Sequence, residues 1–286
     1  MTLLIIVLIL ALLWVLAVQG RSSHPGMKEL RGWNYAHRGL HGNGAAENSM
    51  TAFRLAVENG YGMEFDLHLL KDGNLGVMHD SLLNRTTGQA GRIEDLYTQD
   101  LKNYRLENTE DTIPQFVDVL TLVDGKVPLI IELKPEDGNH AKLAETACNM
   151  LKGYKGVYCI ESFDPRCIAW LRKNRPDIIR GQLSENFFRD RTDLSDGLKF
   201  LLTHNLANFL SRPDFIAYKF ADRNSTPSNW LCRKLWRVQG VSWTLRSKED
   251  HDTALKEGWL SIFEHKVVLG NRKLADKYQY PDVRGS

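Results

Sequence analysis

Residues 62–80 have the sequence GMEFDLHLLKDGNLGVMHD. Apolar and acidic side chains alternate at its start, and a period of two is the pattern of a β-strand. Because neighbouring side chains on a strand point to opposite faces, Glu64 and Asp66 share one face. The stretch therefore predicts a strand over Gly62–Leu70 that carries two carboxylates side by side.

The second half of this stretch predicts a hairpin. Lys71-Asp72-Gly73-Asn74 is followed by a second apolar run, Leu75–His79. An Asp-Gly pair between two such runs is typical of a two-residue turn. In that register Lys71 pairs with Asn74, and Asp66 lies opposite His79. Two carboxylates and an imidazole are then expected to converge.

The chain from residue 33 onward repeats an alternation of β-rich runs and amphipathic helical runs. Alternating strands and helices favour a parallel sheet. Eight strands within 254 residues predict a closed (β/α)8 TIM barrel over residues 33–286, with a small insertion over residues 81–112 after the second strand. The predicted strands are Trp33–Ala36, Gly62–Leu70, Leu129–Leu133, Tyr158–Ser162, Ile178–Leu183, Phe215–Phe220, Val241–Leu245 and Leu260–Glu264.

The first twenty residues differ from the rest. Leu3–Val18 is an unbroken run of 16 apolar residues. A helix over residues 1–20 would be roughly 30 Å long, about one hydrocarbon core, and predicts a single-pass transmembrane anchor joined to the barrel by a linker over residues 21–32. A cleaved signal peptide is the alternative, but no Lys or Arg precedes the run. Basic residues follow it, which favours a cell-membrane protein with a cytoplasmic body.

Composition excludes several classes of protein. The chain has 37 Lys+Arg against 35 Asp+Glu and a formal net charge of +2, with both signs mixed along its length. It therefore lacks the basic excess of a nucleic-acid-binding protein, and we expect no nucleic-acid partner. Its four cysteines form no CxxC pair, so neither a disulfide framework nor a thiolate zinc site is expected.

Charged side chains stand at the ends of otherwise apolar strands, where barrel enzymes place their catalytic groups. Glu64, Asp66 and Glu132 offer three carboxylates, and buried carboxylates are costly unless they are paired or bound to metal. Hard oxygen ligands suit Mg²⁺ or Ca²⁺ better than zinc. The sequence predicts one divalent cation at these three residues.

Histidines and cations flank this predicted metal site. His37 and His79 are suited to acid–base catalysis, because an imidazole titrates near neutral pH. Arg38 and Lys134 supply positive charge for an anion, and Trp243 stands near the end of the seventh strand. Together these residues predict metal-assisted cleavage of a phosphate ester.

These motifs, in this order and spacing, resemble those of the glycerophosphodiester phosphodiesterase family. The likeness extends from Trp33 to about Lys266. The motifs that carry it are His37-Arg38-Gly39, Glu47-Asn48, Glu64-x-Asp66, Lys71-Asp72-Gly73, His79-Asp80 and Glu132-x-Lys134.

The resemblance implies a barrel enzyme that hydrolyses a glycerophosphodiester to sn-glycerol 3-phosphate and an alcohol. It implies a divalent cation on the three carboxylates, His37 and His79 as the acid–base pair, and phosphate contacts from Arg38 and Lys134. Trp243 would line the glycerol side. The chain departs from the family pattern at its last strand, which ends Ile262-Phe263-Glu264-His265 in place of a Thr-Asp pair.

Other interpretations of the same residues stay open. Glu64 and Asp66 also fit an outward-facing polar stripe on an edge strand, and Glu132 with Lys134 fits a plain ion pair. A second enzymatic interpretation is phospholipase D-like cleavage of lysophospholipids at the membrane. A third is a non-catalytic binding module that kept the barrel, which the joint presence of the histidines and carboxylates disfavours.

Overall fold

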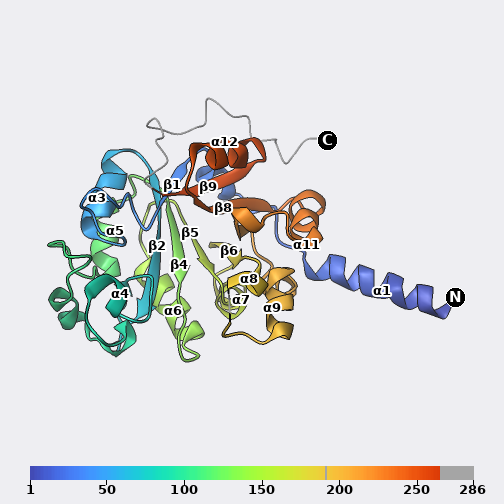
Figure 1. Cartoon of the computed structure of the whole chain (residues 1–286), viewed down its shortest axis with the longest axis horizontal. Coiled ribbons are helices and arrows are strands. Elements are labelled where there is room, and N and C mark those ends of the chain that lie inside the picture. The colour runs from blue at the N-terminus through green and yellow to red at the C-terminus, as the bar shows by residue number, and fades with distance from the viewer. Residues whose placement is uncertain (191, 265–286) are drawn as a thin grey trace.

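Eight parallel strands close into a barrel (Figure 1), as predicted. The structure is a computed structural model that describes residues 1–190 and 192–264; the rest of the predicted barrel range, residues 265–286, lies outside the described residues. Closure is direct, because the first strand pairs with both the second and the last. Each predicted strand lies within two residues of an observed one: β1 Asn34–His37, β2 Gly62–Leu69, β4 Leu129–Leu133, β5 Tyr158–Ser162, β6 Ile179–Ser184, β7 Phe215–Lys219, β8 Gln239–Leu245 and β9 Trp259–Phe263.

Helices follow the strands and cover the outside of the barrel (Figure 1). Several begin at a side-chain cap; the Ser49 and Ser247 hydroxyls accept from the backbone N–H three residues on, and Asp164 caps a helix whose first residue is Pro165. The helices of the outer layer are α3 Met50–Glu58, α5 Phe116–Val123, α6 His140–Met150, α7 Pro165–Asn174, α9 Asp196–Thr203, α10 Asn208–Ser211, α11 Pro227–Trp230 and α12 Lys248–Lys256.

Apolar side chains form separate cores on the two faces of the sheet. Phe65 on β2 packs against Phe116 of α5, in the layer between strands and helices. Tyr35 and Phe215 belong to a second cluster that fills the barrel. Glu64 and Asp66 on β2 point away from the outer layer and are buried, so they are not an outward-facing stripe. The four cysteines are free and buried: Cys148, Cys159, Cys167 and Cys232.

The predicted hairpin forms, but its predicted register is wrong by one residue. β3 Leu75–Val77 pairs antiparallel with β2 through Leu67↔Val77 and Leu69↔Leu75. The connecting loop has three residues, because the Leu70 N–H donates to the Asn74 carbonyl at 2.8 Å and Gly73 takes a positive φ of 85°. The backbone opposite Asp66 is therefore that of Met78, not His79.

The segment predicted as an insertion packs around its own small core. It contains α4 Asn84–Thr87 and two short 3₁₀ helices, η1 Ile93–Asp95 and η2 Thr98–Asn103. Leu83, Ile93 and Leu101 cluster there with Leu70 and Met78 from the hairpin. The insertion is thereby fixed to the hairpin, whose strand β2 carries Glu64 and Asp66 and whose second arm leads into His79.

The N-terminal apolar run is a helix, but the predicted transmembrane span is not supported. α1 spans Thr2–Ala17 and projects from the barrel (Figure 1). Among the described residues, no helix combines the length and the apolar character needed to cross a membrane. The residues after Ala17 bind the barrel instead: Asn208 donates to the Val18 carbonyl at 3.1 Å, and Arg212 donates to the Gln19 carbonyl at 3.1 Å.

Packing at β6 yields a test of the barrel interior. A Cβ on Gly181 would lie 2.1 Å from ring carbons of Phe215 on β7. We expect Gly181→Ala to lower the free energy of unfolding by about 1–3 kcal/mol, measured by urea denaturation, because the ring must move. Gly197→Ala is the control: it has open space around it on α9, and it should be neutral or stabilise by up to about 1 kcal/mol. Equal effects of the two substitutions would contradict this packing.

Candidate active site

The register of the parallel strands gathers the acidic residues at one end of the barrel. Asp66 on β2 lies beside Glu132 on β4, and Glu132 lies beside Glu161 on β5. Glu64, Asp66 and Glu132 each have an oxygen within 4.8 Å of the others, and all three side chains are buried. Since adjacent strands are about 4.8 Å apart, the register alone sets Asp66 beside Glu132, and Glu64 joins them from the same face of β2.

Crowding of like charges dominates the electrostatics of this cluster. Burial, together with the neighbouring Asp66, Glu132 and Glu161 carboxyls, raises the pKa of Glu64 well above its ordinary value. Burial likewise raises the pKa of Glu132 to about 7, despite the nearby Lys134 ammonium. Burial also opposes ionisation of Asp66, but Lys134, His79 and Arg38 hold the pKa of its carboxyl well below its usual range. The cluster carries more buried acid than the adjacent cations neutralise.

Two cationic side chains contact the carboxylates directly. The Lys134 Nζ lies 2.7 Å from Glu132 Oε1 and 3.2 Å from Asp66 Oδ1. The Arg38 backbone N–H donates to Glu64 Oε2 at 3.1 Å, and its guanidinium Nη1 donates to Glu47 Oε1 at 2.9 Å. Arg38 has a positive φ of 55°, so the chain turns sharply where β1 ends. This turn brings the Arg38 side chain back to within 3.8 Å of Asp66.

Each predicted catalytic histidine has a carboxylate beside its Nδ1. His37 Nε2 lies 3.9 Å from Glu64 Oε2, and its Nδ1 lies 3.5 Å from Glu264 Oε1. His79 Nδ1 lies 2.6 Å from Asp80 Oδ1. Burial lowers the pKa of His37 to about 4, and burial with the Lys134 charge lowers the pKa of His79. Both imidazoles are therefore biased toward their neutral forms.

Three carboxylates near these residues were not predicted as site residues. Glu161 extends the acidic row, and its position within an apolar strand was the available signal. Glu264 stands where the chain departs from the family pattern, and it also binds the Arg246 guanidinium through both oxygens. Glu47 belongs to a quoted motif, and it accepts from Arg85 at 2.6 Å as well as from Arg38.

A cavity of about 840 Å³ opens onto this cluster. Of the predicted site residues, it is lined by His79, Glu132, Lys134 and Trp243. The Trp243 ring packs edge-on against Phe163 at 5.5 Å, and Lys134 Nζ lies 5.9 Å from the Phe163 ring centroid. His37, Arg38, Glu64 and Asp66 join the same cluster through the contacts described above. The structure thus brings all eight predicted residues to one end of the barrel.

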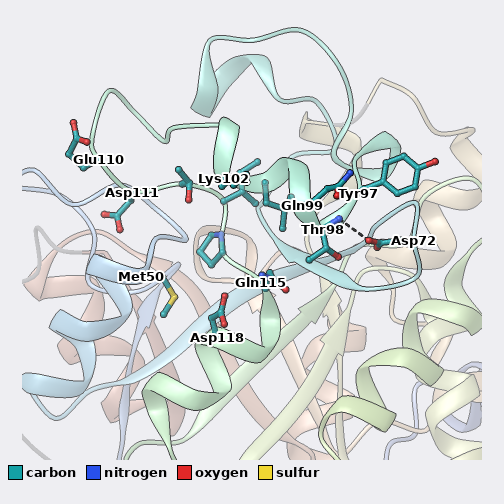
Figure 2. Close-up of a pocket in the computed structure, with 14 residues that line it drawn as sticks. Met50, Asp72, Tyr97, Thr98, Gln99, Lys102, Glu110, Asp111, Gln115 and Asp118 are labelled. Atoms are coloured by element: carbon teal, nitrogen blue, oxygen red, sulfur yellow. Dashed lines mark hydrogen bonds between the residues drawn. The ribbon is translucent and has the colours of Figure 1, made fainter.

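A second cavity of about 720 Å³ lies between the insertion, α3 and α5 (Figure 2). Met50 and Asp118 reach it from the two helices, and Thr98 N–H donates to Asp72 at 2.9 Å on its rim. None of the eight predicted site residues lines this cavity. It is separate from the acidic cluster.

Comparison with known proteins agrees with the motifs. The model of the glycerophosphoryl diester phosphodiesterase family matches residues 37–268. The chain belongs to this family. A glycerophosphodiester phosphodiesterase of Bacillus altitudinis is 39% identical over 155 residues, which cover 50% of this chain and 63% of that protein. Bovine glycerophosphodiester phosphodiesterase 1 is 41% identical over 253 residues, which cover 75% of this chain and 72% of that protein.

The human form of the latter protein is 30% identical over 157 residues, and the chain spans only 46% of its length. Solved structures of phosphodiesterases share the fold. An Oleispira antarctica phosphodiesterase, solved with the product sn-glycerol 3-phosphate, has a TM-score of 0.69 at 20% identity and covers 84% of this chain and 95% of its own. A Parabacteroides distasonis glycerophosphodiester phosphodiesterase has a TM-score of 0.63 at 24% identity, covering 82% and 92%.

The raised pKa of Glu132 generates a test by pH. The folded chain holds this proton up to a pH of about 7, whereas the unfolded chain releases it near 4.5, so the carboxyl makes the free energy of unfolding fall as pH rises between these values. In EDTA, Glu132→Gln should therefore stabilise the chain, and increasingly so as pH is raised through this window. The lowered pKa of His37 makes the free energy of unfolding rise with pH instead. His37 is present in both the wild type and Glu132→Gln, so its contribution largely cancels in the difference between their free energies of unfolding.

Urea denaturation of the wild type and of Glu132→Gln, both in EDTA and at a series of pH values, checks this. A difference in free energy of unfolding that stays constant across the window would contradict the crowding of acids at this site.

Proposed function

We propose that this protein hydrolyses glycerophosphodiesters to sn-glycerol 3-phosphate and an alcohol, with one divalent cation, Mg²⁺ or Ca²⁺, held by Glu64, Asp66 and Glu132. The observation that carries the proposal is the buried three-carboxylate cluster flanked by two histidines and two cations at one end of the barrel. Membership of the glycerophosphoryl diester phosphodiesterase family supports it. So does the product named with the Oleispira antarctica structure.

The residues present fit a divalent cation. Three hard oxygen donors converge within 4.8 Å, which matches the ligand preference of Mg²⁺ and Ca²⁺. Burial and the neighbouring carboxyls raise the pKa values of Glu64 and Glu132, and an added positive charge would favour their ionised forms. When bound, such an ion supplies Lewis-acid charge to a phosphate oxygen.

The chain's own residues bind the phosphate, transfer the protons and form the cavity wall. Arg38 and Lys134 offer positive charge to the non-bridging phosphate oxygens, and the Arg38 fork suits a bidentate contact. His37 and His79 form the acid–base pair: one takes a proton from the attacking water, and the other gives a proton to the oxygen of the leaving alcohol. Asp80 accepts from His79 Nδ1, which leaves Nε2 as the reactive nitrogen of the neutral ring. Trp243 closes one wall of the cavity.

Hydrolysis of glycerophosphoethanolamine by the full chain tests the proposal. We expect sn-glycerol 3-phosphate and ethanolamine in equal amounts, loss of activity in EDTA, and recovery on addition of Mg²⁺ or Ca²⁺. His37→Asn and His79→Asn should each lower kcat by about 10²- to 10⁴-fold, the usual contribution of a general acid or base. His24→Asn is the control, since His24 binds a backbone carbonyl outside the site.

Metal binding has its own readout. The cation should raise the unfolding temperature of the wild-type chain and not that of Glu64→Gln/Asp66→Asn. Activity that is indifferent to chelation, or full turnover by either histidine variant, would overturn the corresponding assignment.

We also infer that α1 binds a lipid surface. Its large apolar side chains from Leu3 to Leu13 are 48–74% exposed, an apolar surface far larger than soluble proteins leave uncovered. The base of the helix is held to the barrel, because Trp236 Nε1 donates to the Val15 carbonyl at 2.9 Å and Trp14 Nε1 donates to Ser228 Oγ at 3.0 Å. Lipid contact by α1 would therefore hold the whole barrel at the membrane surface.

Flotation with phosphatidylcholine vesicles tests this contact. The full chain should float with the vesicles, and Leu8→Glu/Leu12→Glu should remain with the soluble fraction, because each charge opposes insertion of the helix. Leu82→Glu, at an exposed leucine of the insertion, is the control and should float like the wild type. Flotation of the double variant at the wild-type level would contradict lipid binding by α1.

A further inference from the structure

The connection between β7 and β8 is both basic and apolar, and the hydrolysis proposed above uses none of it. Residues 223–238, which we call the basic connection, include four cations and no carboxylate: Arg223, Arg233, Lys234 and Arg237. Trp230 is 62% exposed and Leu235 is 53% exposed. Exposed Trp and Leu side chains together with Lys and Arg are typical of segments that lie at a membrane–water interface.

α1 joins the barrel at the basic connection (Figure 1). Trp14 Nε1 donates to the Ser228 hydroxyl at 3.0 Å, and Trp236 Nε1 donates to the Val15 carbonyl at 2.9 Å. Ser228 belongs to α11, and Trp236 directly follows η4 Leu231–Leu235, a short π-helix. Because these bonds hold the base of α1 against the basic connection, a lipid surface that binds α1 also lies close to the exposed side chains of the connection.

α10 adds a second exposed apolar patch beside α1. Phe209 is 49% exposed and Leu210 is 46% exposed. Asn208, the residue before them, donates to the Val18 carbonyl and so holds α10 against the base of α1. Arg172 of α7 donates to the carbonyls of both exposed residues, at 3.1 Å and 2.9 Å. Apolar and basic side chains are therefore found together on α10 as well as on the basic connection.

A cavity of about 500 Å³ lies beside the basic connection. Of the described residues that line it, three are cations and one is a carboxylate: Arg223, Arg233, Lys234 and Glu257. Arg223 already donates to both oxygens of Glu257, at 2.9 Å and 3.1 Å. The cavity therefore keeps the positive charges of Arg233 and Lys234, with no second carboxylate among these residues to offset them.

Arg233 is held in place but keeps an unused donor. Its guanidinium carbon lies 3.6 Å from the centroid of the Trp259 ring, and its Nη2 donates to the Glu257 carbonyl at 2.8 Å. Its Nε is buried and has no hydrogen-bond partner within residues 1–190 and 192–264. Burial lowers the pKa of this guanidinium to about 10, and a bound anion would oppose that shift. A fixed cation of this kind suits an anionic ligand.

The rest of the lining suits a phosphate group. Asn224, Ser225 and Thr226 lie beside the cations and offer amide and hydroxyl donors. Phosphate oxygens accept hydrogen bonds from such groups and pair well with Arg and Lys. Phospholipids present a phosphate at the headgroup level, which is also where exposed Trp side chains lie. In an anionic phospholipid no headgroup ammonium neutralises that phosphate.

We propose that the basic connection binds anionic phospholipid at a bilayer surface, with Trp230 and Leu235 in the interface and one lipid phosphate in the cavity beside Arg233 and Lys234. The proposal rests on the lipid contact inferred for α1 and adds a preference that α1 does not supply. Residues 1–17 contain no charged side chain, so α1 has none with which to distinguish anionic from zwitterionic lipid.

Vesicle titrations of the full chain test the proposal. One set of vesicles is phosphatidylcholine, and the other is phosphatidylcholine mixed with phosphatidylglycerol. The readout is the ratio of the two partition coefficients, because the apolar contact of α1 contributes to both and cancels. We expect the mixed vesicles to bind more tightly by roughly fivefold for each cation that reaches the anionic surface. Leu8→Asn/Leu12→Asn weakens the apolar contact without adding charge, and it gives the same ratio where the wild type binds both vesicles too tightly to measure.

Variants locate the preference in the cavity. Lys234→Gln should lower the ratio roughly fivefold, the usual effect of one cation near an anionic surface. Lys126→Gln is the matched control, because Lys126 is an exposed lysine before β4, and it should leave the ratio unchanged. Arg233→Gln should lower the ratio at least as much as Lys234→Gln, whereas Arg233→Lys keeps the charge and should retain most of the preference. A thermal melt of each Arg233 variant confirms that the barrel is still folded.

The outcomes separate this proposal from the earlier ones. Equal affinity for the two kinds of vesicle would overturn it, and so would a preference that Lys234→Gln and Arg233→Gln leave unaltered. Inorganic phosphate tests the other occupant: thermal stabilisation by phosphate that Arg233→Gln removes, without any preference between vesicles, would identify a site for soluble phosphate and contradict lipid binding. Weak binding to phosphatidylcholine alone would contradict the lipid contact of α1, and the ratio would still test the basic connection. None of these measurements depends on hydrolysis.

Discussion

The site depends on one constraint, the parallel register that sets buried carboxylates side by side. Asp66, Glu132 and Glu161 occupy matched positions on three adjacent strands, and Glu64 stands two residues before the first. The strand positions that carry these groups cannot separate without breaking the barrel's hydrogen bonds, so their crowding is built into the fold. Lys134 and Arg38 offset part of the repulsion among them. A divalent cation would offset the rest, and we infer that its binding free energy is also folding free energy for this chain.

Most of the barrel was predictable because strand periodicity is a local property. β4 and β5 were predicted residue for residue, since both are short apolar runs with clear breaks on either side. The hairpin register was not predictable to the residue, because Asp72-Gly73 permits both a two-residue and a three-residue loop and only the packing of Leu75 and Val77 into the outer core decides between them. His79 still contributes to the lowered pKa of Asp66, because the chain leaves the β3 ladder before His79 and is not bound to the ladder's register there.

Contacts between distant parts of the chain account for what the sequence did not reveal. An acidic residue within a short strand is a weak signal by itself, and the importance of Glu161 appears only when Glu132 lies beside it. Glu264 is recognised as part of the site only through its contacts with the His37 and Arg246 side chains, which are 227 and 18 residues away in the sequence. The same applies to α1: hydropathy identified an apolar helix, but its end at Ala17 follows from hydrogen bonds to residues near 208–236.

The division between chemistry and substrate choice follows the division between strands and loops. Every carboxylate, histidine and cation proposed to act on the phosphate comes from a strand of the sheet or from the few residues after one, where the barrel holds them in place. The apolar wall of the cavity, lined by Leu194, Leu198 and Leu202, comes instead from the long connection between β6 and β7, which has room for α8 Phe187–Asp190, α9 and α10. A connection of that length is not needed to join neighbouring parallel strands. Its two hydrogen bonds to the barrel, from Ser184 and Tyr218, and its leucines that line the cavity indicate that it serves to shape the site. Changes in this connection would therefore alter which phosphodiester enters, while the charged cluster that acts on it stays the same.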